Sequence, residues 1–487
     1  MKFYKIILPC VLLTAAVSCQ KVIDVKETNF IGGDVALQTV NNNEQAIVGA
    51  YAASAIEMDI LLNATLSDEV KKAEFYNAAT THEWQYTSTD ITIRDNFTAI
   101  NNLYRVIDRV NRVLVALPNA DSTKTGDAAL KVKLRGEALF LRAFSHFQLW
   151  RYYSGDTDPN ALAMSYIDAP LPTPTTATPR IAVGPYFQKL NADLATCKDL
   201  VPNNLTDIGR VTRLAVSGLQ ARIALYLKDW TNAITYSTEY INGLPLASRA
   251  QFPGIWADTL NTEVAFKLRR STATSGLLGT GTSRLGSLFR STSANATTIG
   301  TVTWAPSDKL WNSYDQTNDI RFSTYLKDEP LLANASPSRP SRIIRKYAGT
   351  AYGTAAENVA DAKVFRTGEM YLIRAEAKAE SNDLIGAAAD LNALRAARIS
   401  GYVTAIFTSK QDLIDAVMLE RFKELAFEGH RFWDLRRRNL PVERLASDAP
   451  SSAGATLPAG NFRFRLPIPN AEIQANSAIQ QNPGYTN

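Results

Sequence analysis

Apolar residues recur at helical spacing in the first half of the chain. In residues 103–117 they follow the i, i+3, i+4, i+7 pattern that places them on one face of an α-helix. Pro118 and Asn119 predict the end of this helix. A second helical pattern covers residues 130–154, with Gly155 near its end. The inward positions are Leu103, Val106, Ile107, Val110, Val113, Leu114, Leu117, Leu134, Ala138, Leu141, Phe144, Phe147 and Leu149.

Two later helical segments share an internal pattern. Helical spacing resumes at residues 184–200 and 212–242, and it returns at residues 371–398. In both of the last two segments a small residue is followed by a bulky residue nine positions later and by a second small residue twelve positions later. These residues are Ala221, Trp230 and Ala233, and then Ala375, Leu384 and Ala387. Small residues where antiparallel helices cross are typical of tetratricopeptide hairpins. Alanine is common in helices, so the matches favour stacked hairpins without proving a repeat.

The sequence changes character between residues 244 and 365. Gly, Ser and Thr become frequent, helical spacing mostly disappears, and short β-prone runs occur at residues 263–270 and 341–348. This much irregular chain inside a compact protein usually serves a function. The pattern as a whole predicts a mainly α-helical protein of tetratricopeptide-like hairpins, with long loops and minor β elements.

The N-terminal residues have the features of a secretory signal. Lys2 and Lys5 form a positive start, and residues 6–17 form an apolar core that is too short to span a bilayer. Small residues then lead to Cys19, as in the lipobox of bacterial lipoproteins, although Ala16 stands where leucine is more common. We predict a signal peptide that is removed and a lipid on Cys19. The alternative is an ordinary secretory signal with a chance cysteine.

A lipid on Cys19 would hold the mature chain at a membrane, because two or more acyl chains give stable anchoring. No later run approaches 18 apolar residues, so no further membrane span is expected. The segment after Cys19 is polar and contains a Gly pair. We therefore predict a signal peptide at 1–18 and a lipidated tether at 19–45.

Composition is ordinary for a globular protein. The 487 residues are 46% hydrophobic and 20% charged, enough for a large core and too apolar for wholesale disorder. Removing Lys2 and Lys5 lowers the formal charge from +5 to +3, too weak a bias to indicate nucleic-acid binding. The three cysteines fit no disulfide framework or zinc pattern, and the three histidines are far apart, so neither a metal nor a cofactor is expected.

Four segments in order resemble the SusD/RagB family of outer-membrane nutrient-binding lipoproteins. They are RGEALFLRAFSHFQLWRYY, GEMYLIRAEAKAE…AAADLNALRAAR, LERFKELAFEGHRFWDLRR and LPIPNAEIQANSAIQQNPGY, and the lipobox is a fifth element. The resemblance implies a helical fold built on tetratricopeptide-like pairs, with loops and small strands on one side. It also implies a SusC-like TonB-dependent transporter barrel as partner. On this basis we expect residues 46–243 and 244–487 to form the N-terminal and C-terminal parts of one compact body.

One motif of the resemblance carries a dense set of charges. Paired carboxylates could indicate acid–base hydrolysis. The same residues at i, i+4 spacing could equally form a salt-bridged helix face that braces the loops, and we favour this structural interpretation. The set comprises Glu420, Arg421, Glu424, Glu428, His430, Arg431, Asp434 and Arg436.

Aromatic residues in polar, non-periodic segments are the candidates for ligand contact, because aromatic faces match the apolar faces of sugar rings. The resemblance implies a ligand site built from the segment before the first long helix and from residues 244–365. Trp311 lies at helical offset from Asp308, so we expect it in the core. The candidates are Tyr76, Trp84, Tyr86, Trp256, Trp304 and Tyr352.

The most favoured function is capture of an oligomeric nutrient, by resemblance a glycan, for import by the transporter. A peptide ligand is the first alternative, since the family also has peptide-binding members. A surface glycan-degrading enzyme is a second, although the sequence offers no nucleophile motif, metal constellation or Gly-rich phosphate loop. A helical scaffold without a small ligand is a third.

Overall fold

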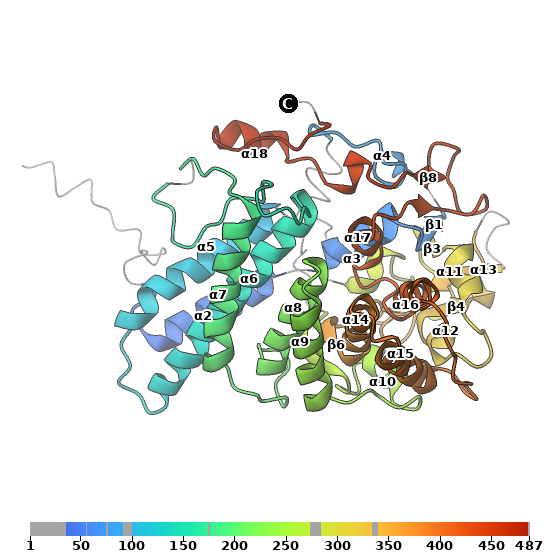
Figure 1. Ribbon diagram of the computed structural model, residues 1–487, viewed down its shortest axis with the longest axis horizontal. Coiled ribbons are helices and arrows are strands. Elements are labelled where there is room, and N and C mark those ends of the chain that lie inside the picture. The colour runs from blue at the N-terminus through green and yellow to red at the C-terminus, as the bar shows by residue number, and fades with distance from the viewer. Residues whose placement is uncertain are drawn as a thin grey trace, which may run out of the picture.

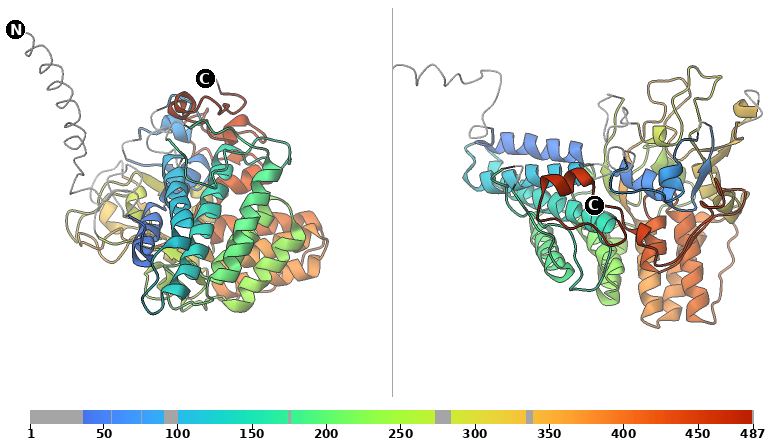
Figure 2. Two further views of the ribbon diagram at one scale, coloured as in Figure 1. Left: turned by 90° about the vertical axis from the view of Figure 1, so that its left-hand side faces the viewer. Right: turned by 90° about the horizontal axis from the view of Figure 1, so that it is seen from above.

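The computed structural model describes residues 36–54, 56–74, 76–90, 100–173, 176–272, 284–333 and 339–485. The signal peptide and Cys19 lie outside this range. Helices form most of the molecule, and Figure 2 shows the irregular region gathered on one side of the helical array. Helix α2 begins at Val40, so the predicted tether is wrong for residues 40–45, which are helical.

Four of the N-terminal helices, α2, α5, α6 and α7, pack side by side, whereas α3 and α4 lie apart from them and contact each other (Figure 1). Helix α5 ends at Ala116, and a 3₁₀ turn with Pro118 follows, so the predicted helix end is confirmed. Between residues 40 and 66 the chain is long and apolar enough to cross a membrane, but it folds as two helices, and 59% of its most apolar 18-residue window is buried. The helices are α2 (Val40–Ala53), α3 (Glu57–Leu66), α4 (Ala79–His82), α5 (Ile100–Ala116), α6 (Asp127–Tyr153) and α7 (Val183–Leu200).

Two helical hairpins confirm the stacked arrangement that the alanines favoured. Helices α8 (Arg213–Tyr226) and α9 (Trp230–Gly243) form the first, and α14 (Thr367–Glu380) and α15 (Leu384–Arg398) form the second. Helix α9 also packs against α14, so the hairpins are stacked. The four alanines at the predicted crossings are fully buried: Ala221, Ala233, Ala375 and Ala387.

The two hairpins turn in the same way. Lys228 and Asn382 occupy the left-handed region, with φ of 59° and 67°. In each hairpin the next residue is an aspartate that caps the second helix. Asp229 accepts a hydrogen bond from the Asn232 N–H, and Asp383 accepts one from the Gly386 N–H.

The C-terminal part closes on the hairpins. Helix α16 (Lys410–Glu424) packs against α14, and the predicted break before α17 (Arg431–Arg437) contains Gly429 at a φ of 83°. Strands β7 (Val442–Glu443) and β8 (Thr456–Leu457) pair, and the tail carries the 3₁₀ helix η4 (Phe462–Phe464) and α18 (Asn470–Ala475). In Figure 1 this tail runs along the top of the molecule.

The irregular region contains short helices and two-stranded antiparallel sheets. Both β-prone runs are confirmed as strands, β2 and β5. Strand β1 pairs with β3, β2 with β6, and β4 with β5, and the first two of these sheets join segments that are distant in sequence. The elements are β1 (Val70–Lys72), α10 (Phe252–Trp256), β2 (Val264–Leu268), η3 (Leu285–Leu288), β3 (Trp304–Pro306), α11 (Asp308–Ser313), α12 (Ile320–Tyr325), β4 (Leu326–Asp328), α13 (Pro330–Ala333), β5 (Arg342–Ile344) and β6 (Ala362–Arg366).

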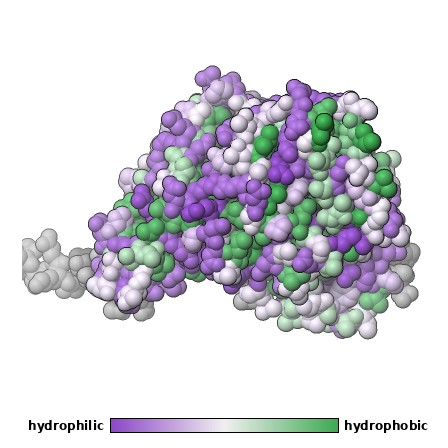
Figure 3. Space-filling model, turned by 60° about the horizontal axis from the view of Figure 1, so that its bottom comes forward, coloured by the Kyte–Doolittle hydropathy of each residue, from purple (hydrophilic) through white to green (hydrophobic). Residues whose placement is uncertain are grey.

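The main apolar core includes residues from both halves of the chain. Phe140 of α6 lies 6.4 Å, between ring centroids, from Phe365 of β6, and Trp311 is buried as expected. On the face shown in Figure 3, hydrophobic residues are interspersed with hydrophilic ones, which is usual for a surface in contact with water.

A buried ion network joins α16 to the irregular region and confirms that the charged motif braces the loops, although its partners are distant in sequence and not at i, i+4 spacing. The Glu424 carboxylate lies 3.1, 3.0 and 3.1 Å from the guanidinium groups of Arg321, Arg366 and Arg398, and Arg366 also pairs with Glu428 at 2.6 Å. All five side chains are buried. These carboxylates therefore form ion pairs, and the pairs hold the loops on the helices. Within the charged motif, His430 and Arg436 have no carboxylate partner among the described residues.

Candidate ligand site

A pocket of about 580 Å³ lies within the irregular region, between α10, α12, β4 and the loop that follows β5. All of its lining residues fall inside residues 244–365. Its volume is in the range of small-molecule sites. The lining residues are Pro253, Trp256, Ala257, Ala296, Ser323, Thr324, Lys327, Arg345, Lys346, Ala348, Gly349, Thr350, Ala351 and Tyr352.

Trp256 forms part of the wall at the end of the short helix α10, which begins with Phe252 and Pro253. Its ring is only 4% exposed, and it meets Tyr325 edge-on at 5.4 Å between centroids. Its indole N–H has no acceptor among the described residues.

Tyr352 forms another part of the wall and is half-buried. Its hydroxyl donates to the Glu329 carboxylate at 2.6 Å, and the Arg290 guanidinium lies 5.0 Å from its ring centroid. Burial and the Glu329 carboxylate raise the pKa of Tyr352, so the hydroxyl stays protonated. These contacts fix the ring at the pocket.

Lys346 connects the pocket to the ion network. Its ammonium group lies over the rings of Trp256 and Tyr325, 4.0 and 3.7 Å from their centroids, and it donates to Glu428 at 2.7 Å. Burial lowers the pKa of Lys346 to about 7, although Glu428 opposes this shift. The sequence pattern did not single out Lys346, because nothing in the run after β5 distinguishes a buried lysine from a solvated one.

Four of the six predicted ligand residues lie outside this pocket. Trp84, Tyr86 and Trp304 are core residues with exposures of 3, 0 and 4%, so the expectation that they present free faces is wrong. The Trp84 indole donates to the Leu66 carbonyl at 2.9 Å, and the Tyr86 hydroxyl donates to the Arg463 carbonyl.

Tyr76 is half-buried and packs edge-on against Trp304, with 6.1 Å between centroids. Its hydroxyl donates to Glu83 at 3.1 Å. The two predicted regions therefore do meet, through strands β1 and β3, but they meet as packed core. Only Trp256 and Tyr352 are brought together at a pocket.

The chemistry of the described residues offers no metal cluster: no three His, Cys, Asp or Glu side chains in that part of the chain could hold an ion together. Burial lowers the pKa of both His82 and His146 to about 3, which keeps each ring neutral and engaged with a backbone carbonyl.

Comparison with known protein families gives two matches on separate parts of the chain. Residues 292–485 match the family described as the SusD family. Residues 23–225 match a SusD-like family described as starch-binding and associating with outer membrane. No curated protein sequence matches the chain.

Solved structures share the fold. A SusD superfamily protein from Bacteroides thetaiotaomicron VPI-5482 is 22% identical, with a TM-score of 0.78, over 91% of this chain and 100% of that one. A SusD-like carbohydrate binding protein from Bacteroides vulgatus ATCC 8482 is 20% identical, with a TM-score of 0.73, over 91% and 97%. A laminarin binding SusD-like protein is 21% identical, with a TM-score of 0.73, over 92% and 100%.

Proposed function

Since this chain belongs to the SusD/RagB family, we propose that it is a surface-exposed outer-membrane lipoprotein that binds an oligosaccharide and delivers it to a SusC-like TonB-dependent transporter barrel. The observation that carries the proposal is the pocket with Trp256 and Tyr352 in its wall, in a chain of a family whose members include a laminarin binding protein.

The pocket supports sugar binding by its combination of groups. Tyr352 brings aromatic surface, the buried Trp256 closes the wall behind it, and cationic side chains such as Lys327 and Arg345 bring hydrogen-bond donors. A capture protein must release its cargo, so we expect micromolar affinity, which corresponds to about −8 kcal/mol.

The proposal is tested by titrating the purified mature chain calorimetrically with maltoheptaose, with laminarin oligosaccharides and with a mixed peptide library. We expect one glycan class to bind with micromolar affinity and to be recovered intact. Binding of peptides alone would favour the peptide-binding alternative, and release of new reducing ends would favour the enzyme.

The lipid anchor rests on the residues around Cys19. In cells that lack the transporter, we expect the parent protein in the membrane fraction and the Cys19→Ala variant in the soluble fraction. A variant that still sediments with membranes would contradict lipidation at Cys19.

Delivery requires a physical partner. We expect a tagged chain, extracted from membranes in mild detergent, to retain a TonB-dependent barrel in stoichiometric amount. If the chain is recovered alone, even after gentle crosslinking, the result would count against delivery to such a barrel. Oligosaccharide binding would then remain as the function.

A further inference from the structure

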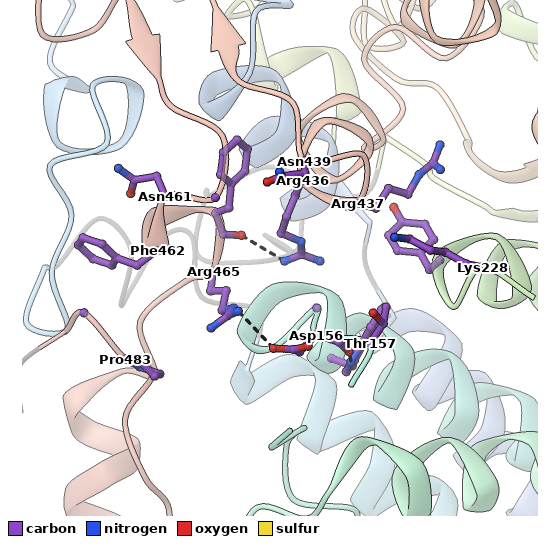
Figure 4. Close-up of a pocket in the computed structure, with 16 residues that line it drawn as sticks. Asp156, Thr157, Lys228, Arg436, Arg437, Asn439, Asn461, Phe462, Arg465 and Pro483 are labelled. Carbon is purple, nitrogen blue, oxygen red and sulfur yellow. Dashed lines mark hydrogen bonds and ion pairs between the residues drawn. The ribbon is translucent and has the colours of Figure 1, made fainter. Parts of the chain in front are cut away.

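A second pocket, of about 390 Å³, lies where the C-terminal end of α6, the α8–α9 turn, α17 and the tail meet. It shares no lining residue with the candidate ligand site. Figure 4 shows the side chains around it: Arg436, Arg465 and Lys228 border one space, and Asp156 lies beside Arg465. Four of the lining residues are cationic, and Asp156 is the one lining residue with a carboxylate.

Two of the four cations have carboxylate partners. Arg437 pairs with Glu376 at 2.5 Å and with Asp434 at 2.7 Å, and Figure 4 shows its side chain turned away from the others. Arg465 pairs with Asp156 at 3.3 Å. The pocket's only carboxylate is therefore already shared with one arginine.

Arg436 is different. One of its terminal nitrogens, Nη1, donates to the carbonyls of Arg151 and Phe464 at 2.7 and 3.1 Å, and its guanidinium lies 4.6 Å from the Trp433 ring centroid. Its Nε and Nη2 have no acceptor, and it has no ion pair, within the described residues. An enclosed charge without a counter-charge is costly.

A comparison with Arg444 shows what Arg436 lacks. Arg444 also has no carboxylate partner in the described part of the chain, but its guanidinium donates to four backbone carbonyls, those of Thr65, Ser67, His82 and Gly454. Arg436 has only two. The backbone at Gly155, at a φ of 68°, packs directly on the Arg436 guanidinium, where a Cβ would lie 2.2 Å from it.

Lys228 is the second uncompensated cation. It is exposed, it is held by the left-handed turn between α8 and α9, and it has no ion pair in the part of the chain that the structure describes. Burial, with Arg465 and Arg151 nearby, lowers the pKa of Arg436 to about 9, so this side chain also remains charged at neutral pH. Within the described ranges, neither Arg436 nor Lys228 has a carboxylate at ion-pair distance, so the pocket carries an excess of positive charge.

We propose that this pocket is a binding site for an oxyanion carried on a small ring, such as the carboxylate of an acidic sugar. Lys228 and Arg465 would contact the anion, and the charge of Arg436 would hold it there. Opposite charge in a partly enclosed pocket is attracted more strongly than at an open surface. Phe462 is the exposed aromatic residue in the wall and offers surface for the ring, whereas Trp150 and Tyr226 are buried behind it.

The site is tested with sodium glucuronate as the probe. Its binding to the full mature chain is measured by saturation-transfer NMR at low salt. Glucose has the same ring without the carboxylate, and we expect it to bind at least tenfold more weakly. Inorganic sulfate added as a competitor identifies the source of the anion. If sulfate displaces glucuronate only at concentrations far above the glucuronate Kd, the site is assigned to the sugar acid. If sulfate competes as well as glucuronate itself, the site is assigned to a free anion.

The decisive variant is Lys228→Asn combined with Arg465→Gln. Asparagine tolerates the left-handed conformation at 228, and both side chains reach solvent, so we expect the fold to be kept. Glucuronate affinity should fall at least tenfold. Arg269→Gln is the matched control, because Arg269 is an exposed arginine paired with Asp207 at 2.8 Å and lies outside the pocket.

Two results would overturn the proposal. In the first, glucose binds with the same affinity as glucuronate; in the second, the double variant binds glucuronate with the affinity of the parent. The second would place the anion elsewhere, for example beside the cations near Tyr352. This site does not depend on the proposed function, because a chain that bound no neutral oligosaccharide could still pass this test.

Discussion

At the scale of single residues, burial decides which aromatic side chains can serve a ligand. Trp84 lies in a polar, non-periodic stretch, where sequence gives no sign of packing, yet it is a core residue. Its indole bonds the Leu66 carbonyl, and the Arg444 guanidinium lies 4.3 Å from its ring centroid. These partners come from helix α3 and from the C-terminal part, so local sequence could not reveal them.

Replacing Trp84 by alanine should therefore damage stability rather than binding. We expect a loss of about 3–5 kcal/mol in the free energy of unfolding, the usual cost of truncating a buried tryptophan. The affinity of the folded variant for its oligosaccharide should equal that of the parent. Urea unfolding and calorimetric titration measure the two quantities, and a stable variant with weakened binding would reverse this assignment.

Glu420 should show its ion pairs in the pH dependence of stability. Burial alone would raise the pKa of this carboxyl, but Arg321, Lys423 and Arg395 together lower it from 4.5 to about 2. The stabilisation, about 3 kcal/mol, is present above pH 4.5 and is lost as the pH falls towards 2. The free energies of unfolding of the parent and of Glu420→Gln should differ most at neutral pH and converge near pH 2. A difference that stays constant with pH would contradict the ion-pair explanation.

At the scale of elements, the repeated hairpin is the feature that sequence predicted best. Alanines at matching offsets mark crossings that the structure confirms, and the Asp caps follow from local chemistry. The left-handed Lys228 and Asn382 were not predicted. Asparagine often adopts that conformation, but lysine seldom does, so the first turn had no visible signal.

Enlarging a crossing residue should overpack the hairpin. We expect Ala233→Leu to lower the free energy of unfolding by about 1–3 kcal/mol, because the α8–α9 contact has no room for the added methyl groups. Thr235→Leu places the same side chain on the exposed face of the same helix and should change stability little. Equal melting temperatures for the two variants would argue against a tight crossing at Ala233.

The joint between α16 and the irregular region depends on Glu424. Replacing it by glutamine leaves the buried Arg321, Arg366 and Arg398 short of a counter-charge, so we expect a loss of about 3–5 kcal/mol. Glu239→Gln, which breaks a more exposed pair with Lys198, is the control and should cost under about 1 kcal/mol. Comparable losses, measured by urea unfolding, would show that the network does not brace the loops.

At the scale of the whole molecule, a helical array supports one irregular side that holds the candidate site (Figure 2). Helical spacing and the change in composition after residue 244 were enough to predict this division. The pocket itself was not predictable. Trp256, Lys346 and Tyr352 come from segments up to about a hundred residues apart, and they meet only because sheet pairing and the buried pair of Lys346 with Glu428 position them.

The central claim is that an oligosaccharide binds at the pocket of Trp256 and Tyr352. It is tested most directly by calorimetric titration of the bound glycan against Tyr352→Ala and Tyr76→Ala. The two tyrosines are closely matched: each is half-buried, bonds a glutamate and has a lysine 5.5 Å from its ring centroid, but only Tyr352 lines the pocket. We predict that Tyr352→Ala weakens binding at least fivefold, about 1 kcal/mol, while Tyr76→Ala binds like the parent. Unchanged affinity in Tyr352→Ala, or a greater loss in Tyr76→Ala, would contradict the account.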